Sequence, residues 1–138
     1  MKQEFRLHSW DWDVQVFYEA GPRDEAEIVA ALHEIGCSDD KLEAARGIFD
    51  EGRRNYGMTY SNYRLHASVV IIGRTSSAAE FQNSYDHEKG HLAKHICRAL
   101  HISPWGEEAE YLAGAIGQKT FEVARHLLCE HCRKKVVS

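Results

Sequence analysis

The sequence predicts one domain over residues 1–138, of the α+β class, in which a small β-sheet packs on helices. Three observations carry this prediction. Apolar residues alternate near the N-terminus, a β-branched run covers residues 68–72, and helical spacing with capping residues begins at residue 77. A chain of this length with 43% hydrophobic residues is long enough for one core and too short for two ordinary ones.

The first expected element is an alternating segment that ends before Gly21-Pro22. Apolar residues recur at every second position within its two stretches, Phe5 and Leu7, then Trp10, Trp12, Val14, Val16 and Tyr18. This period is typical of half-buried strands, because successive side chains point to opposite faces. The segment therefore forms either one long bent strand or a pair of short strands.

Two helices are expected next. The first covers residues 25–35, where apolar residues recur at helical intervals and Gly36 stands at the C-terminal cap position. The second begins after a cap at Ser38 or Asp39 and extends to about Arg54.

Residues 55–62 are rich in Asn, Gly, Tyr and Ser without periodicity, which predicts a loop. The β-branched run predicts a strand over 64–72. Ser77 and Glu80 then have the spacing of a capping box, so a helix is expected over 78–99.

The last helix is expected from Glu107 to about Cys132. Pro104 and Gly106 interrupt the preceding helix, and acidic residues stand in the first turn of the new one, where they favour the helix dipole. The sheet would pack on this long C-terminal helix and on the helix of 78–99, and the helices of 25–54 would cover another side.

The charge balance argues against two classes of partner. The chain has 17 basic and 21 acidic residues, a formal charge of -4, and its basic residues are scattered, so neither nucleic acid nor an anionic membrane is expected. No apolar run approaches the roughly 18 to 20 residues of a membrane-spanning helix. The N-terminus lacks the apolar block of a secretory signal, and we expect a cytoplasmic protein without structural disulfides.

The segment His87-Glu88-Lys89-Gly90-His91 matches the metal-binding motif H-E-x-x-H. Four residues make slightly more than one helical turn, so both imidazoles leave the same face and can bind one Zn²⁺. Glu88 lies beside the metal, where it can take a proton from water whose pKa zinc lowers to about 7. Gly90 is a poor helix residue, which predicts that another group packs closely against it.

This arrangement resembles the zincin superfamily, and in particular small gluzincin-like peptidases, over residues 63–117. The extended segment from His87 to His95 is also similar to the H-E-x-G-H-x-x-x-H helices of ImmA/IrrE-type peptidases. The resemblance implies a minimal zincin-like fold, zinc held by His87 and His91, Glu88 as catalytic base, and a glutamate on the next helix as third ligand.

Three glutamates can supply that third ligand. Glu108 is favoured because it shares a helical face with apolar residues that must turn toward the core, while Glu107 and Glu110 remain alternatives. His95 lies about 12 Å along the helix from His87, too far to share one ion, and is expected to pack beside the ligands.

The expected function is therefore a cytoplasmic zinc metallopeptidase that acts on a peptide or protein substrate. An extended substrate would pair with the strand near residues 69–72. The alternative is a catalytically inactive zincin-like binding or regulatory protein of phage or mobile-element type. Cys129 and Cys132 form a C-x-x-C without a second pair, which predicts two ordinary cysteines at a helix end.

Overall fold

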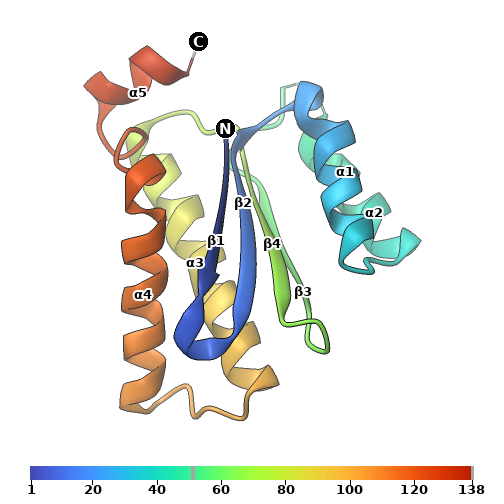
Figure 1. Cartoon of the computed structure of the whole chain (residues 1–138). Coiled ribbons are helices and arrows are strands. Elements are labelled where there is room, and N and C mark those ends of the chain that lie inside the picture. The colour runs from blue at the N-terminus through green and yellow to red at the C-terminus, as the bar shows by residue number, and fades with distance from the viewer. Residues whose placement is uncertain (51, 138) are drawn as a thin grey trace.

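The computed structural model describes residues 1–50 and 52–137. A mixed four-stranded sheet lies between two helical layers, with α1 and α2 on one side and α3 and α4 on the other (Figure 1). This arrangement confirms the predicted α+β class. The strands are β1 (Lys2–Leu7), β2 (Trp12–Ala20), β3 (Gly57–Asn62) and β4 (Ala67–Gly73), and the helices are α1 (Glu25–Glu34), α2 (Asp39–Arg46), α3 (Ala78–Ala99), α4 (Glu107–Ala124) and α5 (Glu130–Val136).

The alternating N-terminal segment forms an antiparallel hairpin of β1 and β2, the second of the two predicted possibilities. A short 3₁₀ turn over His8–Trp10 joins the strands, and Asp11 closes it with a φ of 52°. Strand β2 is the longer of the two, and its Trp12, Val14, Val16 and Tyr18 side chains are buried beneath α3 and α4. The period of two therefore identified the core-facing side correctly.

The sheet order is β1-β2-β4-β3, with β4 parallel to β2 and antiparallel to β3. The predicted loop over 55–62 was wrong, because most of it forms strand β3. Its alternate residues Met58 and Tyr60 pack against the core under α1 and α2, which supplies the apolar contact that a strand needs.

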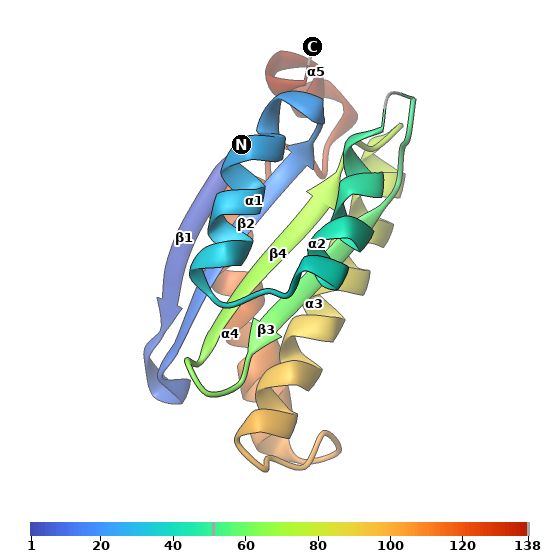
Figure 2. The same ribbon diagram turned by 90° about the vertical axis from the view of Figure 1, so that its right-hand side faces the viewer.

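The same topology corrects the expected docking strand. Residues 69–72 belong to β4, whose backbone is paired on both sides, so they have no free edge for a substrate. The two edge strands are β1 and β3, and β3 is the one that runs alongside α3 (Figure 2).

Helices α1 and α2 cover one face of the sheet. Their buried residues form a core with the side chains of β2 and β4 that point toward them. This core includes Phe17, Ile28, Leu32 and Ile71. Ser38 caps α2 by accepting a hydrogen bond from the backbone of Lys41 at 3.4 Å. The second helix is shorter than predicted: α2 ends at Arg46 and a 3₁₀ turn follows over Gly47–Phe49, while Glu51 lies outside the described residues.

Helices α3 and α4 cover the opposite face, and α4 ends eight residues before the predicted Cys132. The chain turns after this point, and Leu127 in the turn is completely buried in the core. Helix α5 follows the turn. Among the described helices, none is both long and apolar enough to cross a membrane.

Helix α5 contacts the start of α3 through two charged side chains. Arg133 makes a buried ion pair with Glu19 at 2.8 Å and also donates to the carbonyl of Thr75 at 2.8 Å. Glu130 accepts a hydrogen bond at 2.6 Å from the backbone N–H of Ala78, the first residue of α3. An acidic side chain at this end also favours the helix dipole. The C-terminus of the chain thus fixes where the helix that bears the histidine motif begins.

Candidate metal centre

The predicted histidine pair lies in the middle of α3. The helix starts where Ser77 accepts a hydrogen bond from the backbone N–H of Glu80 at 3.1 Å, as the capping spacing predicted. From this start, His87 and His91 project from one flank, and their Nε2 atoms lie 3.1 Å apart. Both rings are exposed to solvent. The structure therefore places close together the ring nitrogens of the two histidines that the motif predicts to be metal ligands.

Glu88 lies on the adjoining face of α3, turned toward strand β3. Its side chain is almost fully buried, and its Oε1 atom accepts a hydrogen bond from the Thr59 hydroxyl at 2.9 Å. Glu88 and His87 line the same small cavity, of about 290 Å³, with Gly57 on the opposite wall. The carboxylate is thus held in one orientation next to the histidine pair.

Gly57 makes room for this carboxylate. A Cβ atom at this position would stand 2.8 Å from Glu88 Oε2 and 2.8 Å from the carbonyl oxygen of Ile71, closer than such atoms approach. Sequence reasoning missed both Gly57 and Thr59 because it assigned them to a loop. The available signal was the alternation of Met58 and Tyr60 with small or hydroxyl residues.

His95 packs against β3, in the role expected for it. Its Nδ1 atom lies 2.8 Å from the Ser61 hydroxyl, which is 2.6 Å from the hydroxyl of Ser68, and Trp12 donates to that hydroxyl at 2.8 Å. Burial, and then the nearby His91 and Arg98, lower the pKa of His95. The ring is therefore a neutral member of a hydrogen-bonded chain that reaches the core.

Gly90 does not have the close neighbour that its position predicted. It is exposed, and a Cβ atom there would meet nothing within 4 Å. The expectation of close packing was wrong, and no contact in the structure explains why glycine stands at this position.

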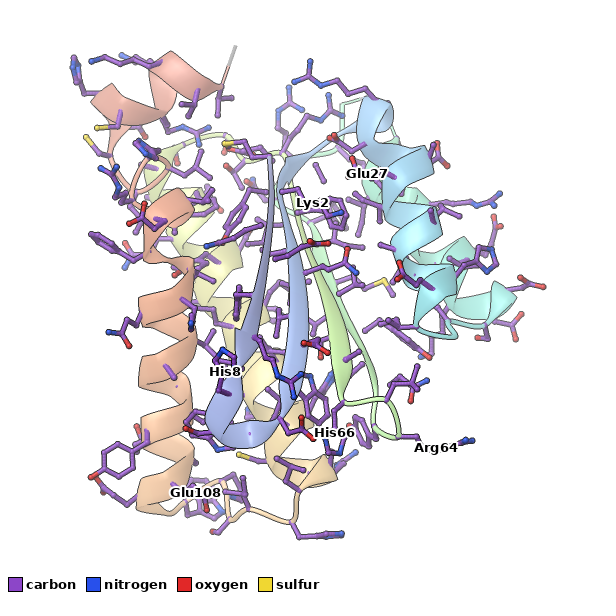
Figure 3. All side chains as sticks on the ribbon, viewed as in Figure 1. Lys2, His8, Glu27, Arg64, His66 and Glu108 are labelled. Carbon is purple, nitrogen blue, oxygen red and sulfur yellow. The ribbon has the colours of Figure 1, made fainter. Side chains whose placement is uncertain are left out.

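Glu108 lies away from the histidine pair. It is exposed on the first turn of α4, near the connection from α3, where Figure 3 labels it. Burial, and then the charge of Glu108, raise the pKa of Cys97, which places this carboxylate beside the last turns of α3. Six residues of helix separate Cys97 from His91, about 9 Å along the axis.

The direction of α4 explains this separation. Helix α4 runs antiparallel to α3, since Tyr85 is hydrogen-bonded to Thr120 at 2.5 Å while Glu108 lies near Cys97. Residues 114–118 are therefore level with the histidines, and none of them is acidic. Tyr85, which faces α4, also lies about 120° around the helix from His91.

No third ligand joins the pair within the ranges that the structure describes. There, no group of three His, Cys, Asp or Glu side chains is placed to hold one metal ion. The alternatives Glu107 and Glu110 are also exposed on the first turn of α4. The ligand role predicted for Glu108 therefore has no geometric support, whereas the convergence of His87 and His91 does.

Comparisons with known proteins do not extend this assignment. No protein-family model, curated protein or solved structure matches the chain. The similarity to zincins consequently rests on the motif in α3 and on its setting beside an edge strand.

Proposed function

We propose that the protein is a zinc-dependent peptidase in which His87 and His91 bind the metal and Glu88 is the general base. The observation that carries this proposal is the 3.1 Å separation of the two Nε2 atoms. Two imidazole nitrogens bound to one tetrahedral zinc at about 2.0 to 2.1 Å would be about 3.3 Å apart. The pair fits the ion with little movement of either ring.

Bound zinc would supply Lewis-acid chemistry, polarising a peptide carbonyl and lowering the pKa of water. The chain's own contribution is the placement of Glu88. Because Thr59 occupies Oε1, the second carboxylate oxygen is available to take the proton of the attacking water. Burial between α3 and β3 keeps this base from rotating into solvent.

The free edge of β3 supplies a place for the substrate. An extended peptide can add to an exposed strand edge through backbone hydrogen bonds. Thr59 lies on this strand and contacts Glu88 directly, so a peptide added to β3 would lie close to the proposed base.

A second candidate is a zincin-like binding protein that lacks catalysis. The absence of a third ligand beside His87 and His91 within the described residues favours it, since catalytic zinc sites ordinarily have three protein ligands. This candidate retains metal binding by the pair and dispenses with proton transfer by Glu88.

Metal analysis after equilibrium dialysis tests the site. Wild-type protein and the control His33→Ala, altered at an exposed histidine of α1, should retain stoichiometric zinc. His87→Ala and His91→Ala should lose it. Zinc content unchanged in His87→Ala would overturn the assignment of the site.

Incubation of the protein with a peptide library, followed by mass spectrometry of the cleavage products, distinguishes the two candidate functions. If the peptidase proposal holds, wild-type protein with zinc cleaves a subset of peptides, and Glu88→Gln binds zinc but cleaves none. Zinc binding without any cleavage by the wild type would favour the binding protein.

A further inference from the structure

A hollow with a volume of about 800 Å³ adjoins His91. It lies between the second half of α3, the loop from α3 to α4, and Tyr63 at the start of the β3–β4 turn. Both ribbon views show this end of α3 extending past the tip of the β3–β4 hairpin (Figures 1 and 2). The lining residues Lys94, Arg98 and Trp105 are exposed, so the hollow is open toward solvent next to one proposed metal ligand.

The charged side chains that line this hollow are all cationic. Lys94 and Arg98 stand one helical turn apart on α3, and no acidic residue lines the hollow. Neither cation has an ion-pair partner in the part of the chain that the structure describes. A chain with a net charge of -4 thus concentrates unpaired positive charge beside the candidate site. Such a pocket favours an anionic ligand.

Two aromatic side chains, Tyr63 and Trp105, also line the hollow. Trp105 is 94% exposed and Tyr63 is 38% exposed, and both line it together with Ile102. Large exposed aromatic side chains next to cations are typical of binding surfaces, where they cover the aliphatic part of a ligand. The fitting ligand therefore has an acidic group on a short carbon stem, as an aspartate or glutamate side chain has.

We propose that this hollow binds an acidic side chain of the peptide that β3 holds, which makes the protein selective for acidic peptide segments. The inference rests on the proposed function, since the position beside His91 is what makes the hollow a specificity pocket. Nucleic acid fits less well, because Lys94 and Arg98 are the two Lys or Arg side chains that line the hollow, too few to follow a phosphate backbone.

Trp105 fluorescence tests this inference in a Glu88→Gln background, which prevents cleavage. The ligands are acetylated, amidated alanine-rich hexapeptides that carry one Glu or, as matched controls, one Gln at each position in turn. The best Glu peptide should bind roughly 1.5-fold to fivefold more tightly than its Gln partner, the range expected for an exposed ion pair. The preference should weaken as salt is added.

A paired substitution identifies the residues responsible. Lys94→Gln combined with Arg98→Gln should abolish the preference for Glu. Arg64→Gln should retain it, because Arg64 at the tip of the hairpin points away from the molecule in Figure 3. Circular dichroism establishes that each variant is folded. If the double variant does not fold, the salt titration of the parent protein decides the question.

The inference would be overturned by equal binding of Glu and Gln peptides, by a preference for Glu that survives the double substitution, or by a preference that is insensitive to salt. Tighter binding of a single-stranded oligonucleotide in competition would also overturn it and assign the hollow to nucleic acid. If His87→Ala keeps its zinc but the Glu preference behaves as expected, only the peptidase proposal fails. Zinc-dependent cleavage without any Glu preference would refute the pocket alone.

Discussion

The Thr59 hydroxyl donates a hydrogen bond to the buried carboxylate of Glu88 over 2.9 Å, which connects the edge strand of the sheet to the centre of the histidine motif. Thr59 comes from β3 and Glu88 from α3, elements separated by the whole of β4 in sequence. This contact sets the orientation of the proposed base. It is the first target for substitution.

Thr59→Val should destabilise the protein by about 1.5 to 3 kcal/mol, the range for a lost hydrogen bond to a charged group. Valine has nearly the same shape as threonine but cannot donate to Glu88. Urea unfolding at neutral pH measures the change. Thr59→Ser keeps the hydroxyl and should fall within about 1 kcal/mol of the wild type. A Thr59→Val variant as stable as the wild type, with a loss only in Thr59→Ser, would mean that the methyl group, and not the hydrogen bond, matters.

Gly57→Ala should lower the free energy of unfolding by about 1 to 3 kcal/mol, as overpacking in a filled site does. The added methyl group would meet the carbonyl oxygen of Ile71 and the carboxylate of Glu88, both at 2.8 Å. Because the first of these atoms belongs to the backbone of β4, the strand itself must shift. Thermal unfolding measures the loss, and an unchanged midpoint would contradict the described packing.

Gly90→Ala should have the opposite effect and stabilise the protein by about 0.5 to 1 kcal/mol. Gly90 is exposed in the middle of α3 with open space around it, so alanine adds helix propensity without a clash. The same unfolding experiment compares it directly with Gly57→Ala. Destabilisation by Gly90→Ala would show that this position contacts something other than solvent.

Arg133→Met should destabilise the protein by about 3 to 5 kcal/mol, because it leaves the buried charge of Glu19 without its partner. The matched control is Arg46→Met on α2, which removes an exposed ion pair with Glu43 and should change stability by less than about 1 kcal/mol. Chemical denaturation measures both variants. Similar small effects would show that α5 does not anchor the start of α3.

Cys129 should be the thiol most reactive toward iodoacetamide. Hydrogen bonds from the backbone N–H of Cys132, from its thiol and from the backbone N–H of His131 lower the pKa of Cys129, so more thiolate is present at neutral pH. The pKa of Cys132 is raised, mainly by its hydrogen bond to Cys129. Burial raises the pKa of Cys37 and Cys97.

Peptide mass spectrometry after timed alkylation gives the order of reaction at the four cysteines. The half-maximal rate for Cys129 should occur at a lower pH than that for Cys132. Cys132→Ala removes one donor to Cys129 and should move its profile toward higher pH. Equal rates at Cys129 and Cys132 in the wild type would contradict the described hydrogen bonds.

The sequence by itself determined the features that depend on neighbouring residues. Helix α3 begins at Ser77 as the capping spacing predicted, and one helical turn brings the Nε2 atoms of His87 and His91 together. The alternation in β2 likewise identified the side that faces the core. These features follow from the periods of helix and strand, which local sequence alone sets.

Only the tertiary structure decided which distant segments meet these residues. The local alternation around strand β3 was too short to identify it, because its stability comes mainly from pairing with β4 and from packing of Met58 and Tyr60. The distance of Glu108 from the histidines depends on how α4 turns back along α3, and spacing in sequence does not specify that. Long-range pairing and helix packing are decided by the whole core, so a short motif can locate two ligands without revealing which groups surround them.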